Sequence, residues 1–134
     1  MKNFAENVID FNQRVLGITP RETGLLAHAE LTLTEKCLRE EIEEFHGASI
    51  NGDILGAIDG LIDLMYFAVG GLYKMGLNSD DISIIGGIVH DCNMSKKLGI
   101  VAKRGDGSAA DAVKPTDWVS PEESIAHYLS NKNG

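Results

Sequence analysis

Apolar residues recur at intervals of three and four through most of the chain, the spacing of one face of an α-helix. This pattern predicts a first helix over residues 3–16, ending near Gly17. The same pattern predicts further helices over 31–49, over 53–75, and from 78 or 79 to 98. A glycine follows shortly after each of these segments. No segment alternates apolar and polar residues over a useful length, so no strand is predicted. The pattern therefore predicts an all-α bundle of four core helices.

Two Ser/Thr-x-x-Glu patterns predict further helix starts. Thr19–Glu22 includes a proline at the first helical position, so the next helical region is expected to open there. Ser120–Glu123 predicts a short C-terminal helix over 121–130. Residues 99–120 have little to bury and are expected to form a loop.

Length and charge limit the organisation and the partners. With 134 residues the chain is expected to be one domain, 1–134, with its core over 3–98. Its net charge of −8 argues against a general nucleic-acid binder. Cys37 and Cys92 lack CxxC spacing, and no signal peptide is recognisable. A cytoplasmic protein is therefore expected.

Acidic residues interrupt the apolar faces of the second and third predicted helices. At about 100° per residue, Glu41 points into its own helix's apolar stripe and Glu44 lies about 60° to one side, whereas Glu43 faces water. The third helix is apolar all round, as buried helices are, yet it holds Asp59 and Asp63 one turn apart. These aspartates also keep any apolar run below the roughly 18 residues of a membrane span, so no membrane contact is expected.

Four carboxylates converge if the two helices pack side by side. Buried anions of this kind require a compensating cation. An all-oxygen donor set favours Mg²⁺, with Mn²⁺ possible, over Zn²⁺. Mg²⁺ also takes phosphate oxygens as ligands, so phosphate chemistry is expected. The predicted ligands are Glu41, Glu44, Asp59 and Asp63.

Polar residues near the end of the fourth predicted helix suit phosphate binding. On a helix, Asn93 and Lys96 would lie about 60° apart on one face, with Lys97 on the other side of Asn93. A lysine can neutralise phosphate charge, and an amide can donate or accept a hydrogen bond. The alternative is that both lysines complement the C-terminal end of the helix dipole.

Three motifs in order carry a resemblance to a known superfamily. They are Glu40-Glu41-x-x-Glu44, Asp63-Leu64-Met65-Tyr66, and Val89-His90-Asp91-Cys92-Asn93-Met94-Ser95-Lys96. They resemble the all-α nucleoside triphosphate pyrophosphohydrolases, which include MazG-like proteins, dimeric dUTPases and phosphoribosyl-ATP pyrophosphohydrolases. The last motif is most similar to the short phage and bacterial phosphoribosyl-ATP pyrophosphohydrolase-like members. The resemblance covers roughly residues 4 to 130. It implies a four-helix MazG-like bundle and Mg²⁺-dependent cleavage of a nucleoside triphosphate between its α and β phosphates, giving a monophosphate and pyrophosphate.

The family's EExxE and ExxD motifs supply its metal ligands. Glu41 and Glu44 match the first motif, and Asp63 matches the last residue of the second. The Glu of ExxD has no match because that position is Gly60; Asp59, one residue earlier, is expected to serve instead.

The resemblance also implies residues that handle water and substrate. Glu40 is expected to position or deprotonate the attacking water. The expected substrate contacts are Asn93, Lys96 and Lys97 for phosphate or sugar, and Asn12, Gln13 and Trp118 for the base. For Trp118 the alternative is a hydrophobic peg that holds the tail to the bundle.

Two other functional interpretations remain. A di-iron carboxylate bundle is favoured only by Glu43-x-x-His46, and this spacing has no second copy on another helix. A non-catalytic helical metal- or nucleotide-binding protein is favoured by Gly60. In either case the third helix is too apolar all round for one subunit to cover, so a homodimer or homotetramer is expected.

Overall fold

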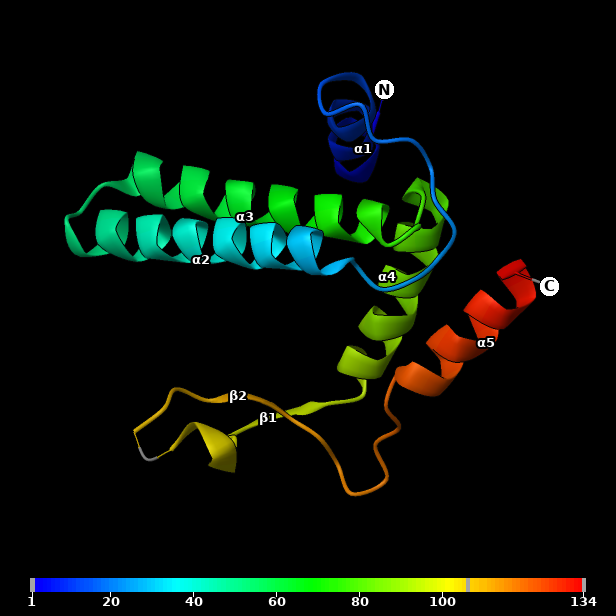
Figure 1. Cartoon of the computed structure of the whole chain (residues 1–134). Coiled ribbons are helices and arrows are strands. Elements are labelled where there is room, and N and C mark those ends of the chain that lie inside the picture. The colour runs from blue at the N-terminus through cyan, green and yellow to red at the C-terminus, as the bar shows by residue number, and fades with distance from the viewer. Residues whose placement is uncertain (1, 106, 134) are drawn as a thin grey trace. The chain divides into compact units, whose positions relative to one another are not determined.

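The computed structural model describes residues 2–105 and 107–133. Over these residues it is predominantly helical, as predicted (Figure 1). The chain forms two compact units, Met1–Ile82 and Ser83–Gly134, and the expectation of one domain stays a prediction.

The first unit is built on an antiparallel pair of long helices. α2 (His28–Ile50) and α3 (Ile54–Lys74) lie side by side along their lengths (Figure 1). Asp53 caps α3 by accepting a hydrogen bond from the backbone N–H of Gly56 at 3.0 Å. α1 (Phe4–Arg14) packs on α3, where Phe4 and Phe11 meet the ring of Tyr66 edge to face.

The predicted helix start at Thr19–Glu22 is wrong, because residues 17–27 form no helix. Tertiary contacts hold this segment extended. Arg21 donates to both carboxylate oxygens of Glu30, at 2.7 and 2.9 Å, and to the carbonyl of Lys74 at 3.3 Å. α2 therefore begins at His28. The bidentate ion pair between Arg21 and Glu30 stabilises the observed conformation more than the local capping pattern would stabilise a helix.

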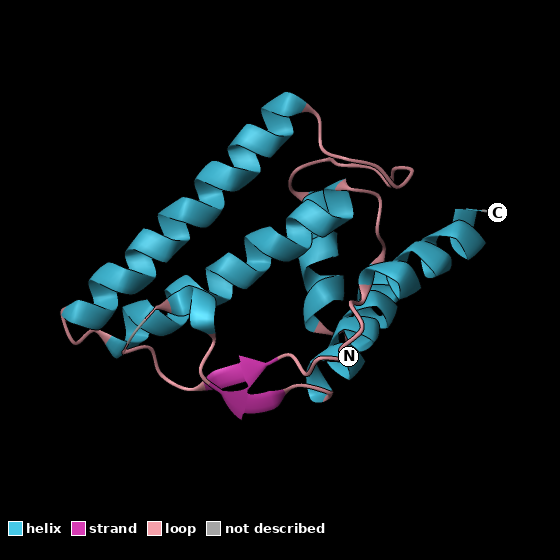
Figure 2. Cartoon of the chain, turned by 90° about the horizontal axis from the view of Figure 1, so that it is seen from below, coloured by secondary structure: helices cyan, strands magenta, loops and turns pink. Residues whose placement is uncertain are grey.

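α4 (Ser79–Met94) opens on a reciprocal capping box between Asn78 and Asp81, and it ends four residues earlier than predicted. After α4 the chain enters a short antiparallel hairpin, in which β1 (Lys97–Gly99) pairs with β2 (Asp111–Val113) (Figure 2). β2 and a 3-10 turn over Ala102–Arg104 lie within the predicted loop, whereas Lys97 and Leu98 of β1 lie in the predicted fourth helix. The prediction of no strands is therefore wrong for this hairpin. α5 (Glu122–Asn133) follows as the C-terminal helix.

α3 is long and apolar enough to cross a membrane by length and composition, with a mean hydropathy of 1.5. The expectation that Asp59 and Asp63 keep this segment below that threshold is therefore wrong. Length and composition alone do not separate a spanning helix from a core helix. The single chain buries few large apolar side chains, and much of α3 is exposed, including Leu55 at 77% and Ile58 at 53%.

Candidate functional site

The site begins with Glu41, the one buried carboxylate on α2. Its side chain is only 9% exposed, and its Oε2 atom is fully buried without a hydrogen-bond partner among the described residues. A buried carboxylate oxygen of this kind is expensive to leave unsatisfied. The prediction that Glu41 points inward is confirmed, and Glu43 is exposed, as predicted.

Other carboxylates surround Glu41. Burial, a hydrogen bond with Glu44, and the negative charges of Glu44, Asp63 and Asp59 together raise the pKa of Glu41 to about 7. Burial first, and then the charges of Asp59 and Glu44, also raise the pKa of Asp63. The α2–α3 pair therefore places the four predicted ligands within electrostatic reach of one another, with no cation among the groups that shift the pKa values of Glu41 and Asp63.

The four carboxylates interact electrostatically but do not form a closed ligand set. In residues 2–105 and 107–133, no group of three or more His, Cys, Asp or Glu side chains is positioned to hold a metal ion. Glu44 and Asp59 are exposed, whereas Glu41 is buried and Asp63 is half-buried. The unpartnered Glu41 oxygen and the all-oxygen donor set fit a hard divalent cation.

Glu40 does not join this group. It is exposed and lines a surface hollow on α2 with Glu43, Lys36 and Arg39. Its charge is not among those that raise the pKa of Glu41. The structure therefore places Glu40 beside Glu43 rather than among the carboxylates that act on Glu41.

Gly60 is buried where α3 packs closely against α2. A Cβ atom at this position would lie 3.1 Å from both the Cα and the N atom of Phe45. The position that matches the family's ExxD Glu therefore faces the backbone of α2, where a carboxylate has no room. Asp59 and Asp63 flank this close approach, and both act on Glu41.

A cavity of about 240 Å³ lies between α1, α2 and α3. Its wall includes Cys37, one helical turn before Glu41, and Tyr66 and Phe67, one turn after Asp63. The cavity therefore lies about one turn beyond the carboxylates along both helices. Its remaining lining residues include Phe11, Asn12, Thr34, Gly70, Gly71 and Lys74.

The two α1 residues predicted to contact the base differ in their surroundings. Asn12 is 3% exposed, lines this cavity, and donates from Nδ2 to the carbonyl of Val8 at 2.9 Å. Gln13 is exposed and donates from Nε2 to the hydroxyl of Tyr73 at 3.3 Å. Asn12 is thus placed at a cavity, whereas Gln13 forms part of the packing of α1 on α3.

In the second unit, the helical face predicted for Asn93, Lys96 and Lys97 does not form. α4 ends at Met94 because the chain turns there: the Ser95 hydroxyl donates to the Cys92 carbonyl at 2.6 Å, and Lys97 joins β1. Asn93 and Lys97 are exposed, and Lys96 is half-buried. The angular relationship expected from a continuous helix is therefore wrong for both lysines.

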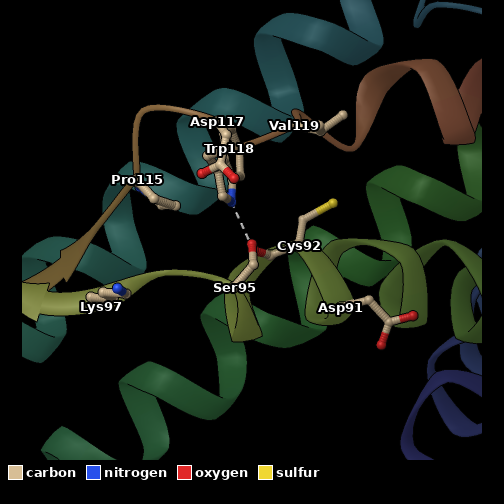
Figure 3. A pocket seen from close by; sticks show the side chains of 8 residues that line it. All are labelled: Asp91, Cys92, Ser95, Lys97, Pro115, Asp117, Trp118 and Val119. Atoms are coloured by element: carbon tan, nitrogen blue, oxygen red, sulfur yellow. Dashed lines mark hydrogen bonds between the residues drawn. The ribbon is translucent and has the colours of Figure 1, made fainter.

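Trp118 is tied to the end of α4. Its indole N–H donates to the carbonyl of Cys92 at 2.7 Å, which satisfies a carbonyl in the last turn of that helix (Figure 3). A cavity of about 550 Å³ beside it is lined by Ser95, Lys97 and Pro115, among others. This hydrogen bond ties the tail to α4, and both the base contact and the hydrophobic peg stay predictions for Trp118.

The sequence prediction assigned no role to Lys114. Its Nζ lies 4.6 Å from the centroid of the Trp118 ring, and the Nζ of Lys96 lies 5.0 Å from the same centroid. The available signal was the Lys114-Pro115 dipeptide shortly before Trp118, because a proline-containing turn returns the chain on itself. The backbone N–H of Trp118 donates to the carbonyl of Pro115 at 3.0 Å and closes that turn.

Residues 10–85 match the sequence model of a family described as phosphoribosyl-ATP pyrophosphohydrolase. The matched range includes the four carboxylates predicted as ligands and the cavity residues on α2 and α3. No curated protein matches the chain.

Proposed function

Because the chain belongs to the phosphoribosyl-ATP pyrophosphohydrolase family of all-α MazG-like pyrophosphohydrolases, we propose that it is an Mg²⁺-dependent nucleoside triphosphate pyrophosphohydrolase. Pyrophosphohydrolase activity on a nucleotide-like substrate follows from the family. The proposal adds cleavage between the α and β phosphates of a nucleoside triphosphate, which releases a monophosphate and pyrophosphate. The observation that carries it is the buried, unpartnered oxygen of Glu41 among three further carboxylates.

Glu41, Glu44, Asp59 and Asp63 would hold the cation. Bound Mg²⁺ or Mn²⁺ would supply charge neutralisation on the phosphates and a water acidic enough to act as a nucleophile. The high pKa of Glu41 means that metal-free protein holds a proton there near neutral pH, which cation binding must displace. We also propose that Glu40 positions or deprotonates the attacking water after its side chain changes orientation.

The cavity beside the carboxylates is the proposed place for the base. At about 240 Å³ it is smaller than the roughly 300–1,000 Å³ of pockets for drug-sized ligands, so it suits one ring system rather than a whole nucleotide. The buried amide of Asn12 is the polar group available to read the ring, and Gln13 would support it through Tyr73. Phosphates would then extend along α2 and α3 toward Glu41.

A second copy of the chain is the proposed partner that covers α3. Exposed apolar side chains follow this helix from its first residue through Phe67, which is unfavourable in water. Burying them in a homodimer or homotetramer would remove that surface from solvent. Insertion of α3 into a membrane is disfavoured by Asp59 and Asp63, since charges in hydrocarbon are costly. A cytoplasmic protein without nucleic-acid or membrane partners is proposed accordingly.

The test is pyrophosphate release from a panel of canonical and modified nucleoside triphosphates and phosphoribosyl-ATP, with Mg²⁺ or Mn²⁺. Glu41→Gln and Asp63→Asn are expected to lower turnover by about 100-fold or more, since each removes a proposed ligand. Glu43→Gln is the matched control: the same change on the same helix, at an exposed position, should leave turnover within about twofold.

Two results would overturn the proposal. One is the absence of turnover across the whole panel by folded protein with either metal, which would favour the non-catalytic binding protein. The other is an equal loss in Glu43→Gln and Glu41→Gln, which would show that the inward position of Glu41 has no special role.

A further inference from the structure

Residues 19–27, here called the strap, join α1 to α2 and are fastened to the end of α3 (Figure 1). The backbone N–H of Gly24 donates to the carbonyl of Met75 at 3.0 Å, and Arg21 donates to the carbonyl of Lys74 at 3.3 Å. Carbonyls at the end of a helix have no partner within the helix. The strap therefore serves as a C-terminal cap for α3.

Ile18, directly before the strap, holds the end of α1 against α3. Its backbone N–H donates to the carbonyl of Asn12 at 2.9 Å, and its own carbonyl accepts from the hydroxyl of Tyr73 at 2.8 Å. Asn12 of α1 and Leu16 after it line the cavity between α1, α2 and α3. The position of the strap therefore decides whether the α1 wall of this cavity is held in place.

α2 begins without a side-chain cap. Ala27 occupies its N-cap position and accepts no hydrogen bond through its side chain, and alanine is a poor N-cap residue. The strap itself contains a better start, because Thr19–Glu22 combines an N-cap threonine, a proline at the first helical position and a glutamate at the third. The local sequence therefore favours a helix that begins at Pro20 rather than at His28.

The extended strap also leaves a buried hydroxyl unsatisfied. Thr23 Oγ1 has no hydrogen-bond partner among the described residues. On a helix, a threonine hydroxyl can donate to the carbonyl three or four residues before it, which here belongs to Pro20 or Thr19. The unsatisfied hydroxyl and the uncapped start of α2 both raise the free energy of the extended strap relative to a helical one.

Two features oppose that helix. Arg21 donates to both carboxylate oxygens of Glu30, at 2.7 and 2.9 Å. On a continuous helix these two residues would lie about 13.5 Å apart along the axis and on opposite faces, so the ion pair and the helix exclude each other. Gly24 is a poor helix former and disfavours the helix as well.

We propose that the strap is a two-state element that controls access to the cavity between α1, α2 and α3. In the extended state, the Arg21–Glu30 ion pair holds the strap on α3 and the cavity is closed. In the helical state, residues 20–27 extend α2 and carry Thr19 about 12 Å beyond Ala27 along the helix axis. Ile18 then leaves Tyr73, so α1 is released and the cavity opens. This inference does not depend on what the cavity binds or on hydrolysis.

Arg21→Gln removes the ion pair and tests the sign of the response. In the full chain, without metal or nucleotide, far-UV circular dichroism should show a gain in helix, and hydrogen exchange of the amides over 23–27 should slow. Arg14→Gln is the matched control, because it removes an exposed ion pair with Asp10 inside α1. That control should leave exchange over 23–27 unchanged.

Gly24→Ala favours the helical state without a clash in the extended one. A Cβ atom at Gly24 would meet nothing within 4 Å, and this glycine is not among those with positive φ. Alanine should shift the equilibrium toward the helix about fivefold, so Gly24→Ala should add to the gain in helix of Arg21→Gln. Thr19→Ala removes the cap and should reverse that gain.

Cys37 lines the cavity, so the reactivity of its thiol reports on access. The background is Cys92→Ser, which leaves Cys37 as the only cysteine. Reaction of Cys37 with an aromatic disulfide reagent should be faster by up to about fivefold in Gly24→Ala, in proportion to the population of the open state.

The inference is overturned if Arg21→Gln loses helix or exchanges faster over 23–27, since the strap would then have no second ordered state. It is also overturned if Gly24→Ala adds no helix to Arg21→Gln, or if a gain in helix leaves the reactivity of Cys37 unchanged. These measurements use neither nucleotide nor divalent metal. Their failure is therefore distinguishable from failure of the hydrolysis assay.

Discussion

Replacing Gly60 with alanine tests whether close approach of α2 and α3 holds the carboxylates together. The added Cβ would lie 3.1 Å from the Cα and N atoms of Phe45, against about 3.5–4.0 Å for an ordinary carbon contact. Because those atoms are backbone, the helices must separate by a few tenths of an ångström. Overpacking of this kind destabilises proteins by about 1–3 kcal/mol.

Alanine also favours a helix over glycine by about 0.5–1 kcal/mol, which partly offsets the overpacking. The expected net loss in the free energy of unfolding for Gly60→Ala is therefore about 0.5–2 kcal/mol. Gly47 lies in the interior of α2, and a Cβ atom added there would meet nothing within 4 Å. Gly47→Ala should gain the propensity term without the clash, about 0.5–1 kcal/mol.

Thermal unfolding followed by far-UV circular dichroism measures both variants. Since 1 kcal/mol corresponds to about 4 °C for a chain of this size, Tm should fall by roughly 2–8 °C in Gly60→Ala and rise by roughly 2–4 °C in Gly47→Ala. The increase in Tm on adding Mg²⁺ should also be smaller for Gly60→Ala, because Asp59 and Asp63 move away from Glu41. Equal stabilisation by both alanines would refute the close-packing argument.

Three further predictions follow from single contacts. The raised pKa of Glu41 means that the folded protein binds this proton more tightly than the unfolded chain does. The stabilisation from this proton is therefore complete below about pH 4.5 and is lost as pH rises through about 7. In calorimetry, metal-free protein should melt at a higher temperature at pH 5 than at pH 8, and Glu41→Gln should reduce that difference. Asn78→Ala removes the side-chain acceptor that caps α4 and should lower stability by about 1 kcal/mol in urea titrations, whereas an unchanged midpoint would show that the capping box contributes nothing. Tyr73→Phe removes a buried hydroxyl that donates to the Ile18 carbonyl at 2.8 Å and should cost about 1–3 kcal/mol by the same measurement, while a neutral effect would mean that water replaces it.

The inward direction of Glu41 and Asp63 could be predicted from the sequence because helical periodicity sets it, whereas Glu44 and Asp59 are exposed. Glu41 and Asp63 fall on apolar faces at about 100° per residue, and the pairing of α2 with α3 follows from the short turn between them. The direction of Glu40 was harder to predict, because its angle lies at the edge of the apolar face of α2. The role of Gly60 depends on the distance between the backbones of α2 and α3. The spacing of apolar residues along the sequence gives no information about that distance.

The errors lie where long-range contacts override local signals. Thr19–Glu22 has a good capping pattern, but Arg21 is held by Glu30 and by the end of α3. Helical spacing continues past Met94, yet residues 97–99 pair with a strand that begins at Asp111. That pairing, and with it the meeting of Lys96 and Lys114, joins positions too far apart for a local pattern to reveal.

The short turn between α2 and α3 also bears on how the protein reaches its fold. The four carboxylates predicted as ligands lie within residues 41–63, on a helical hairpin closed by a few residues. Such local contacts form early and favour fast folding. Early docking of α2 on α3 also brings these negative charges together. Their repulsion would then raise the free energy of the folding transition state. Interactions present in the transition state change the folding rate more than the unfolding rate. A divalent cation would then accelerate folding, and the ionic conditions during synthesis would govern how quickly the new chain matures.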